Sequence, residues 1–371
     1  MIPKSVMTFQ SKCAKLFERK GRRRIMYKIK TNERNNQKAT EFETKSLLYL
    51  LTKAKDHESV DLFIIDCFND VTGASSNYQF SWDIQSKGVA SLTPRTIGVA
   101  LYTLFSNYVS DIDFGHYILY IPPVKDSYIE HSNDQVFDVS NFKSEKYVSL
   151  LAGLQDEIKR RNDPDVNTAS NLRQIDEFLG KVIFVTDCYN KSDYIRSIVE
   201  FKNINQLDDP FLSKIFDEIR NYQALKKIKN VYGTELSSIQ DAEKLGKTIN
   251  RKDIELLVVN RVIGNDLFSP RGVPLYYVQE IQNMDEEDIK DQIQECQSEI
   301  GRTLFNKNNK KAFWLLLESI MLFLSRNSSV GIHTVAKSID DSLKKAVFTL
   351  SDSALLYLIA LVKEGIDNDN P

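Results

Sequence analysis

The chain has 371 residues, which exceeds one average domain and is enough for two hydrophobic cores. Its 49 Lys and Arg residues against 51 Asp and Glu residues leave a net charge of -2, so the average charge does not indicate nucleic-acid binding. No apolar run approaches the roughly 20 residues that span a bilayer, and the four cysteines form no Cys-x-x-Cys pair, so we expect a cytoplasmic protein with reduced thiols.

The first 37 residues form a basic arm. Between residues 12 and 34, positive side chains far outnumber the two glutamates, Glu18 and Glu33. Such a cluster is typical of contact with DNA phosphates, but also of a solvated helix whose basic face aids solubility. The candidate DNA-binding cations are Arg22, Arg23, Arg24, Lys28 and Lys30.

Two adjacent strands are predicted next along the chain. Residues 60–66 and 77–87 are rich in β-branched and aromatic side chains, and a Gly-Ala-Ser-Ser turn separates them. Because side chains alternate along a strand, Asp83, Gln85 and Lys87 share one face. This polar row faces a possible active site, and Asp70 lies between the two runs.

These residue types suit the hydrolysis of a phosphodiester. The carboxylate of Asp70 and the amide oxygen of Gln85 can bind a hard cation such as Mg²⁺ or Mn²⁺, and Lys87 can orient water or neutralise developing charge. Alternatively, Asp70 begins a turn and the Gln-Ser-Lys segment ends an edge strand. The three residues alone favour that second interpretation, and the order of the surrounding elements reverses the preference.

Helices and strands alternate through the following segment. Residues 93–108 and 143–161 predict helices, and residues 116–121 and 181–187 predict strands. Pro210 begins another helix, which runs to about residue 229. Its end carries Lys226, Lys227 and Lys229, where cations suit the helix dipole.

From about residue 235 the pattern is mainly helical, and we place a domain boundary near residue 232. Residues 255–259 predict a short strand or a buried helix turn, and Gly246-Lys247-Thr248 imitates a phosphate-binding loop without its first glycine. The apolar stripe from Phe313 to Leu324 is either intrachain core, which we favour, or a partner surface. The expected helices cover residues 235–248, 285–304, 310–326, 332–350 and 351–365.

Asp70 followed by Gln85-Ser86-Lys87 resembles the PD-(D/E)xK nuclease fold in its Mrr-like form, where glutamine replaces an acidic residue. The segment Phe42-Glu43 resembles the first helix of those enzymes, whose glutamate reaches the metal. Together with Asn69-Asp70-Val71, the spacing over roughly residues 38–200 is similar to the double-stranded DNA endonuclease domain of antiphage defence effectors. Within that group it most resembles the nuclease effector subunit of Lamassu systems.

The resemblance implies an α/β restriction-endonuclease-like domain at residues 38–232, with a central mixed sheet flanked by helices, and an α-helical regulatory or assembly domain at 233–371. It implies catalysis by Asp70, Gln85, Lys87 and Glu43, with Mg²⁺ or Mn²⁺ held by Asp70, Gln85 and Glu43. The implied partners are double-stranded DNA, an SMC-like ATPase subunit, a small accessory subunit and further copies of the chain in an active homo-oligomer. The rival hypothesis is a non-catalytic adaptor with a degenerate nuclease fold, because the neutral amide of Gln85 lowers the negative charge of the site.

Overall fold

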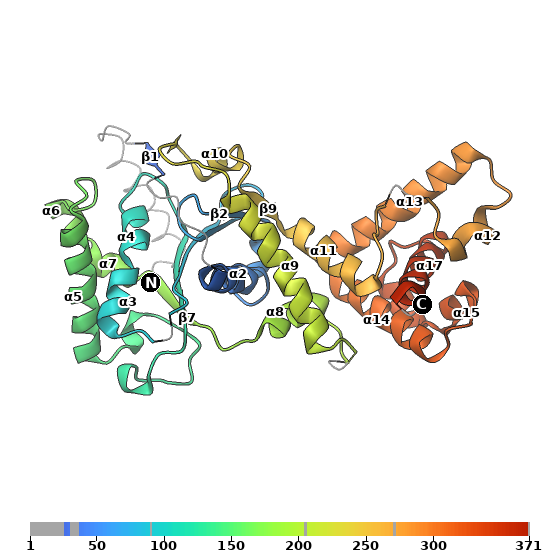
Figure 1. Ribbon diagram of the computed structural model, residues 1–371, viewed down its shortest axis with the longest axis horizontal. Helices are drawn as coiled ribbons and strands as arrows, with labels where there is room; N and C mark the ends of the chain where they lie inside the picture. Colours follow the sequence, from blue (N-terminus) through green and yellow to red (C-terminus); the bar gives the residue numbers. More distant parts are fainter. Residues whose placement is uncertain (1–25, 30–36, 90, 204–205, 270–271, 370–371) are drawn as a thin grey trace, which may run out of the picture.

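The computed structural model describes residues 26–29, 37–89, 91–203, 206–269 and 272–369. A sheet lobe and a helical lobe are joined by helix α11 (Arg251–Ile263), as Figure 1 shows. A mixed sheet flanked by helices and followed by a helical region confirms the coarse fold class that the sequence predicts.

The central sheet has the strand order β6-β7-β5-β4-β3-β2-β9. Strands β2, β3 and β4 form an antiparallel meander, whereas β4, β5 and β7 run parallel to one another. The strands are β2 (Leu62–Ile65), β3 (Val71–Ala74), β4 (Ser81–Ser86), β5 (His116–Ile121), β6 (Val136–Phe137), β7 (Val182–Thr186) and β9 (Thr248–Asn250).

Helices cover both faces of this sheet, which explains why its strands contain continuous apolar runs. One face packs against α2 (Gln37–Thr52), α8 (Lys191–Val199) and α9 (Asp209–Lys227). The other packs against α3 (Pro94–Ala100), α4 (Tyr102–Tyr108), α5 (Ser144–Arg161) and α7 (Ile175–Leu179), and Figure 1 shows the two layers. Short elements complete the lobe: β1 (Tyr27–Lys28), α6 (Ala169–Leu172) and 3-10 turns at His57–Ser59, Asp126–Tyr128 and Val139–Asn141.

Strand β4 alternates as its sequence predicts. Trp82 and Ile84 join the core beneath α2, while Asp83 and Gln85 bond to side chains of α4 on the opposite face. The polar row of the sequence therefore lies on the α4 side of the sheet. A sequence signal also marks the start of α3: the side chain of Thr93, its N-cap residue, accepts a hydrogen bond from the backbone nitrogen of Thr96.

The two predicted strands are not neighbours, because β3 lies between them. The expected turn at Gly-Ala-Ser-Ser is partly strand: Gly73 and Ala74 belong to β3, and the turn itself spans Ser75 to Phe80. Gly73 lies close to the Leu50 side chain of α2. A Cβ there would lie 2.4 Å from Cδ2 of Leu50 on α2, so this glycine marks a close helix–strand contact.

The boundary expected near residue 232 falls inside the sheet lobe. Residues 235–248 form β8 (Glu235–Leu236) and α10 (Ile239–Glu243) and begin β9, in place of the predicted helix, and β9 pairs with β2. Arg251 secures this return of the chain by donating from its guanidinium to the backbone oxygens of Val60 and Leu51. Residues 255–259 lie within helix α11.

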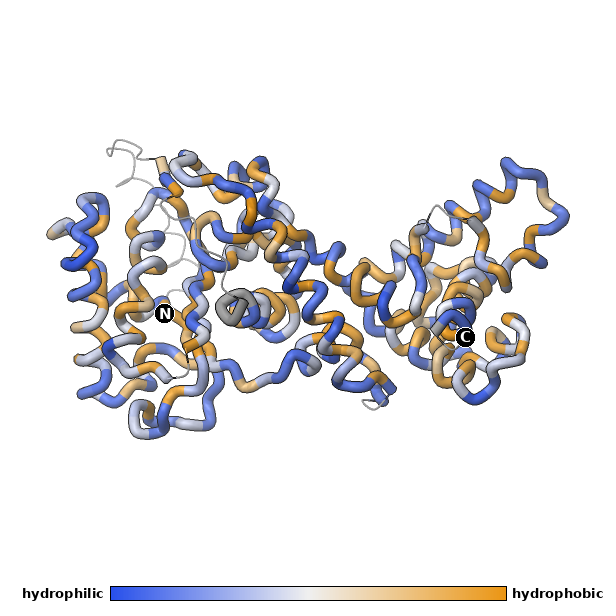
Figure 2. Tube along the Cα trace, in the orientation of Figure 1, coloured by the Kyte–Doolittle hydropathy of each residue, from blue (hydrophilic) through white to orange (hydrophobic). Residues whose placement is uncertain are grey.

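The helical lobe is built around α14 and α17, and most of the apolar stripe of α14 is buried there as intrachain core. The predicted helix at residues 332–350 is two helices. Figure 2 shows hydrophilic residues along the projecting N-terminal half of α13. The elements are a 3-10 turn at Leu275–Tyr277, α12 (Val278–Ile281), α13 (Glu286–Phe305), α14 (Lys310–Arg326), α15 (Ile332–Ser338), α16 (Asp341–Ala346) and α17 (Asp352–Asp369). Among the described residues, no helix has the length and apolar character needed to cross a membrane.

Candidate active site at the end of the sheet

Several polar residues gather where β2 and β4 end and β3 begins. Asp66 follows β2, Asp70 precedes β3, and Gln85 is the next-to-last residue of β4. The register pairs Val71 with Ile84, which places Asp70 opposite Gln85 on the adjacent strand. The structure therefore brings together two residues that lie 15 positions apart in the sequence.

Asp70 is a nearly buried carboxylate held by β4. Its Oδ2 atom accepts hydrogen bonds from Gln85 Nε2 at 2.6 Å and from Ser86 N and Ser86 Oγ, both at 2.7 Å. Within the described residues, its Oδ1 atom has no hydrogen-bond partner. The side chain of Asp70 thus does more than begin a turn, and one of its oxygens remains available to a ligand.

Gln85 presents its amide nitrogen to Asp70 and its amide oxygen to α4, where Thr103 Oγ1 donates to Gln85 Oε1 at 2.6 Å. The sequence hypothesis used that oxygen as a metal ligand, so the observed orientation differs from it. A 180° rotation of the amide would place the oxygen beside Asp70. The nitrogen could then donate to the Thr103 hydroxyl, since a hydroxyl also accepts.

Buried contacts fix the loop that carries Asp70. Asp66 adopts a left-handed conformation with φ 53°, and Lys247 Nζ donates to both its backbone oxygen and its Oδ2 atom at 3.2 Å. Asn69 donates to Asp83 Oδ2 at 2.7 Å. The Gly-Lys-Thr segment that imitates a phosphate-binding loop thus supplies a fully buried lysine that anchors this loop.

Asp83 is an internal anchor of the sheet rather than part of the open site. It is fully buried, and its Oδ2 atom also accepts from Asn107 Nδ2 of α4 at 2.8 Å. Burial raises the pKa of the Asp83 carboxyl group to about 7, because desolvation outweighs the two amide hydrogen bonds. Asp83 shares the face of Gln85, as alternation along the strand predicts, but it is buried and its role is to hold Asn69.

This buried carboxyl group gives a testable pH dependence. Below the unfolded pKa of about 3.9 both states bind the proton, so the stabilising contribution of Asp83 is complete. As pH rises toward 7 the unfolded chain releases the proton first, and we expect a loss of up to about 1.4 kcal/mol per pH unit. Asp83→Asn keeps an oxygen for both amides but does not titrate. Urea unfolding between pH 4.5 and 7.5 should give a flatter profile for the variant; parallel profiles would refute this role.

Glu43 reaches the same end of the sheet from α2. Gly88, just beyond β4, lies so close to α2 that a Cβ would be 2.8 Å from the Cβ of Phe42. The Glu43 carboxylate forms an ion pair with Lys227, the last residue of α9, and both side chains are buried. Burial favours the neutral form of Lys227, but the charges of Glu43, Asp70 and Asp66 hold its pKa above the usual value. The lysine is therefore a charged ammonium amid three carboxylates.

Lys87 follows β4 and is partly exposed. Its backbone nitrogen donates to the Tyr120 oxygen at 2.9 Å, which extends the pairing of β4 with β5. Alternation places its side chain on the same face as Gln85. In the part of the chain that the structure describes, the Lys87 ammonium makes no hydrogen bond or ion pair, so it is a cation available to a ligand at the rim.

The chain matches none of the protein-family models, curated proteins or solved structures with which it was compared. The described residues also contain no ready group of three His, Cys, Asp or Glu side chains that could hold a metal ion. The case for a metal therefore depends on the oxygen atoms of Asp70, Gln85 and Glu43 and on their ability to exchange their present partners.

Of the five candidate DNA-binding cations, the structure describes only one. Lys28 is exposed on β1, which pairs with β8. Arg22, Arg23, Arg24 and Lys30 lie outside the described residues.

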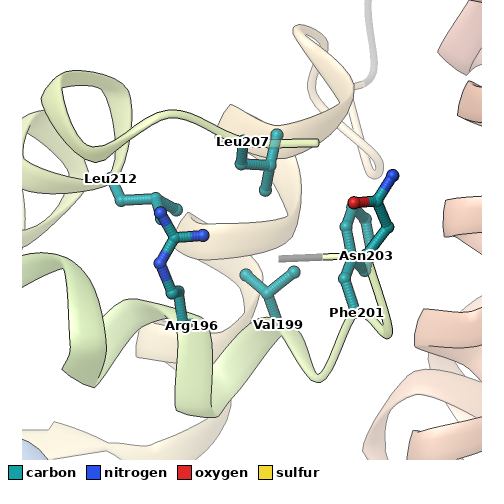
Figure 3. Close-up of a pocket in the computed structure, with 6 residues that line it drawn as sticks. All are labelled: Arg196, Val199, Phe201, Asn203, Leu207 and Leu212. Atoms are coloured by element: carbon teal, nitrogen blue, oxygen red, sulfur yellow. The ribbon is translucent and has the colours of Figure 1, made fainter. Parts of the chain in front are cut away.

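Two hollows elsewhere do not contain the candidate site residues. One, of about 20 Å³, lies beside α8 and is shown in Figure 3; it has room for about one water molecule. The other is a groove of about 1210 Å³ in the helical lobe, lined mainly by α14 and α16.

Sequence reasoning missed the partners that hold the site. It assigned Lys227 to the helix dipole, and it gave no role to Thr103 or to the hydroxyl of Ser86. The cluster of lysines at the end of α9 was a usable signal. Its target, Glu43, lies 184 residues away, and no local pattern connects the two.

Proposed function

We propose that this protein is a metal-dependent endonuclease that hydrolyses phosphodiester bonds of double-stranded DNA. The observation that carries the proposal is the direct contact of Asp70 with Gln85 across two strands, at the sheet end where Lys87 also lies. Such an edge combines a carboxylate, an amide that can turn and an available cation. These groups match the needs of phosphoryl chemistry assisted by a hard cation.

The residues present fit a magnesium or manganese ion that keeps several water ligands. Asp70 offers Oδ1, Gln85 offers its oxygen after rotation of the amide, and Glu43 offers a carboxylate once Lys227 releases it. Mg²⁺ commonly uses one or two carboxylates together with water, so a ready group of three acidic side chains is not required. When bound, the ion would polarise the phosphate and lower the pKa of a coordinated water.

The chain's own residues would position the reactants and balance charge. Lys87 would neutralise the negative charge that develops on the phosphate and orient the attacking water. Ser86 and Thr103 hold Asp70 and Gln85, and Lys247 fixes the loop before Asp70. Rigid support of this kind lowers the cost of reaching the reactive geometry.

Assembly and regulation form part of the proposal. The two strands of a duplex are antiparallel, so cutting both calls for two hydrolytic centres, which a symmetric homo-oligomer supplies. The helical lobe would serve assembly or regulation, with an SMC-like ATPase subunit and a small accessory subunit as partners. We place the active protein in the cytoplasm of a bacterial cell that it defends against phage or plasmid DNA.

The direct test is cleavage of supercoiled plasmid with Mg²⁺ or Mn²⁺. We expect nicked or linear product, none in the presence of a chelator, and a loss of at least about a hundredfold in Asp70→Ala. The matched control is Asp291→Ala, which removes an exposed carboxylate from α13 in the other lobe and should cleave like the parent. Equal cleavage by Asp70→Ala would overturn the assignment of the site.

The rival function is a non-catalytic adaptor that binds DNA or a protein. One observation favours it: Asp70 Oδ2 already accepts hydrogen bonds from Gln85 and Ser86, so the contact between the strands forms without a metal. An adaptor predicts DNA binding that both metals and the chelator leave unchanged, with intact plasmid at all times. Assays of the chain alone and together with its proposed partner subunits separate the two functions.

A further inference from the structure

Two lysines neutralise the acidic residues at the end of the sheet. Lys247 binds Asp66, and Lys227 binds Glu43. The two ammonium groups differ in their surroundings. Lys247 is completely buried and also donates to the backbone oxygen of Asp66, so it is part of the framework.

Lys227 is placed to move. It is the last residue of α9, and the next residues, Ile228, Lys229 and Asn230, are exposed. Its pairing with Glu43 connects the end of α9 to α2. Withdrawal of the Lys227 side chain would break its buried ion pair with Glu43, whereas a shift of Lys247 would disturb the loop that carries Asp70.

A divalent cation and this ammonium compete for the negative charge of the same acidic residues. The Oε2 atom of Glu43 accepts from Lys227 Nζ, and the charges of Asp66 and Asp70 act on the same ammonium. A positive charge at that place repels an incoming dication across a short, poorly screened distance. Mg²⁺ also requires oxygen ligands, so it and the Lys227 ammonium compete for the Glu43 carboxylate.

We propose that Lys227 is the resting counterion of this acidic site and that a divalent cation must displace it to bind Glu43. The inference rests on the proposed function, because it concerns the metal that the proposed nuclease uses. It makes metal loading depend on the position of the end of α9. A contact that draws this end away from α2 would raise the affinity for metal and so activate the enzyme.

The first test measures Mn²⁺ binding by electron paramagnetic resonance, without DNA. Removing the competing charge in Lys227→Met should tighten Mn²⁺ binding by about tenfold or more. The matched control is Lys226→Met, which removes a neighbouring lysine whose ammonium lies over the Tyr222 ring, 5.1 Å from the ring centroid. The Mn²⁺ affinity of this variant should equal that of the parent. Equal or weaker binding by a folded Lys227→Met protein would refute the inference.

The second test uses the unaltered protein, because Lys227→Met removes a buried ion-pair partner of Glu43 and can impair folding. Acetylation of lysine amines, quantified by mass spectrometry, should be slow at Lys227 without metal and severalfold faster with Mn²⁺. Lys226 should react equally in both conditions. An unchanged Lys227 rate while Mn²⁺ is bound would overturn the displacement.

These readouts separate this inference from the proposed function. Tighter Mn²⁺ binding by Lys227→Met without plasmid cleavage would support the counterion and contradict the nuclease. If the parent cleaves plasmid and the parent and Lys227→Met bind Mn²⁺ with the same affinity, the counterion role of Lys227 is contradicted and the nuclease function is not. If neither protein binds Mn²⁺, both proposals fail.

Discussion

Replacing Lys87 with methionine is expected to lower the kcat of plasmid cleavage by about a hundredfold or more, because a group that stabilises transition-state charge acts on the chemical step. Lys87 lies at the end of β4, on the face of Gln85, and its ammonium has no ion-pair partner among the described residues. Its removal should therefore leave the carboxylate and amide ligands in place. We expect Mn²⁺ affinity to stay within about twofold of the parent.

Lys290→Met is the charge-matched control, since Lys290 is exposed on α13 in the helical lobe. Its cleavage rate and Mn²⁺ affinity should both equal those of the parent. If Lys87→Met instead loses metal binding and cleavage together, Lys87 supports the metal site and does not act on the reaction. Full activity in Lys87→Met would exclude it from the mechanism.

Gly98→Ala is expected to destabilise the protein by about 3 kcal/mol, at the upper end of the usual cost of overpacking. Helices α3 and α5 cross with their backbones in contact: a Cβ at Gly98 would lie 1.9 Å from the Leu150 oxygen, and one at Gly153 would lie 2.0 Å from the Arg95 oxygen. The two helices must separate to admit a methyl group. Helix α4, which carries Thr103 and Asn107, follows α3 directly, so the support of Gln85 should loosen as well.

Urea unfolding measures the loss of stability in Gly98→Ala, and Gly331→Ala provides the control. Gly331 has φ −74°, and a Cβ there meets no atom within 4 Å. Its free energy of unfolding should differ from that of the parent by less than about 0.5 kcal/mol. A similarly small change in Gly98→Ala would show that the α3–α5 contact adjusts without strain.

Elements whose signals are local were predictable from the sequence. The strand His116–Ile121 and the helix Lys310–Arg326 have the predicted bounds, because apolar periodicity and flanking prolines or polar residues define both. Gly73 was misread as a turn residue because its place in a strand comes from pairing with Phe63 and Trp82 of the two neighbouring strands. Strand β9 was missed for a related reason, since three residues acquire their strand character only by pairing with β2.

In the candidate site, too, the sequence indicated some residues but not their distant partners. The residues Asp70 and Gln85 were named from the sequence, but the strand that brings them together, β3, was not predicted. The contacts of Lys227 with Glu43 and of Lys247 with Asp66 span 184 and 181 residues. They arise only when α9 and β9 return to the sheet. Sequence reasoning therefore identified the proposed ligands but not the cations that neutralise them.

The most direct test of the account is the position of a bound manganese ion, measured by anomalous X-ray scattering from crystals grown with Mn²⁺. We expect one strong peak at about 2.0–2.3 Å from an Asp70 carboxylate oxygen, with the Gln85 oxygen turned toward it and the Lys227 ammonium withdrawn from Glu43. A peak at another place, or none beside Asp70 at saturating Mn²⁺, would contradict the metal-dependent nuclease centre.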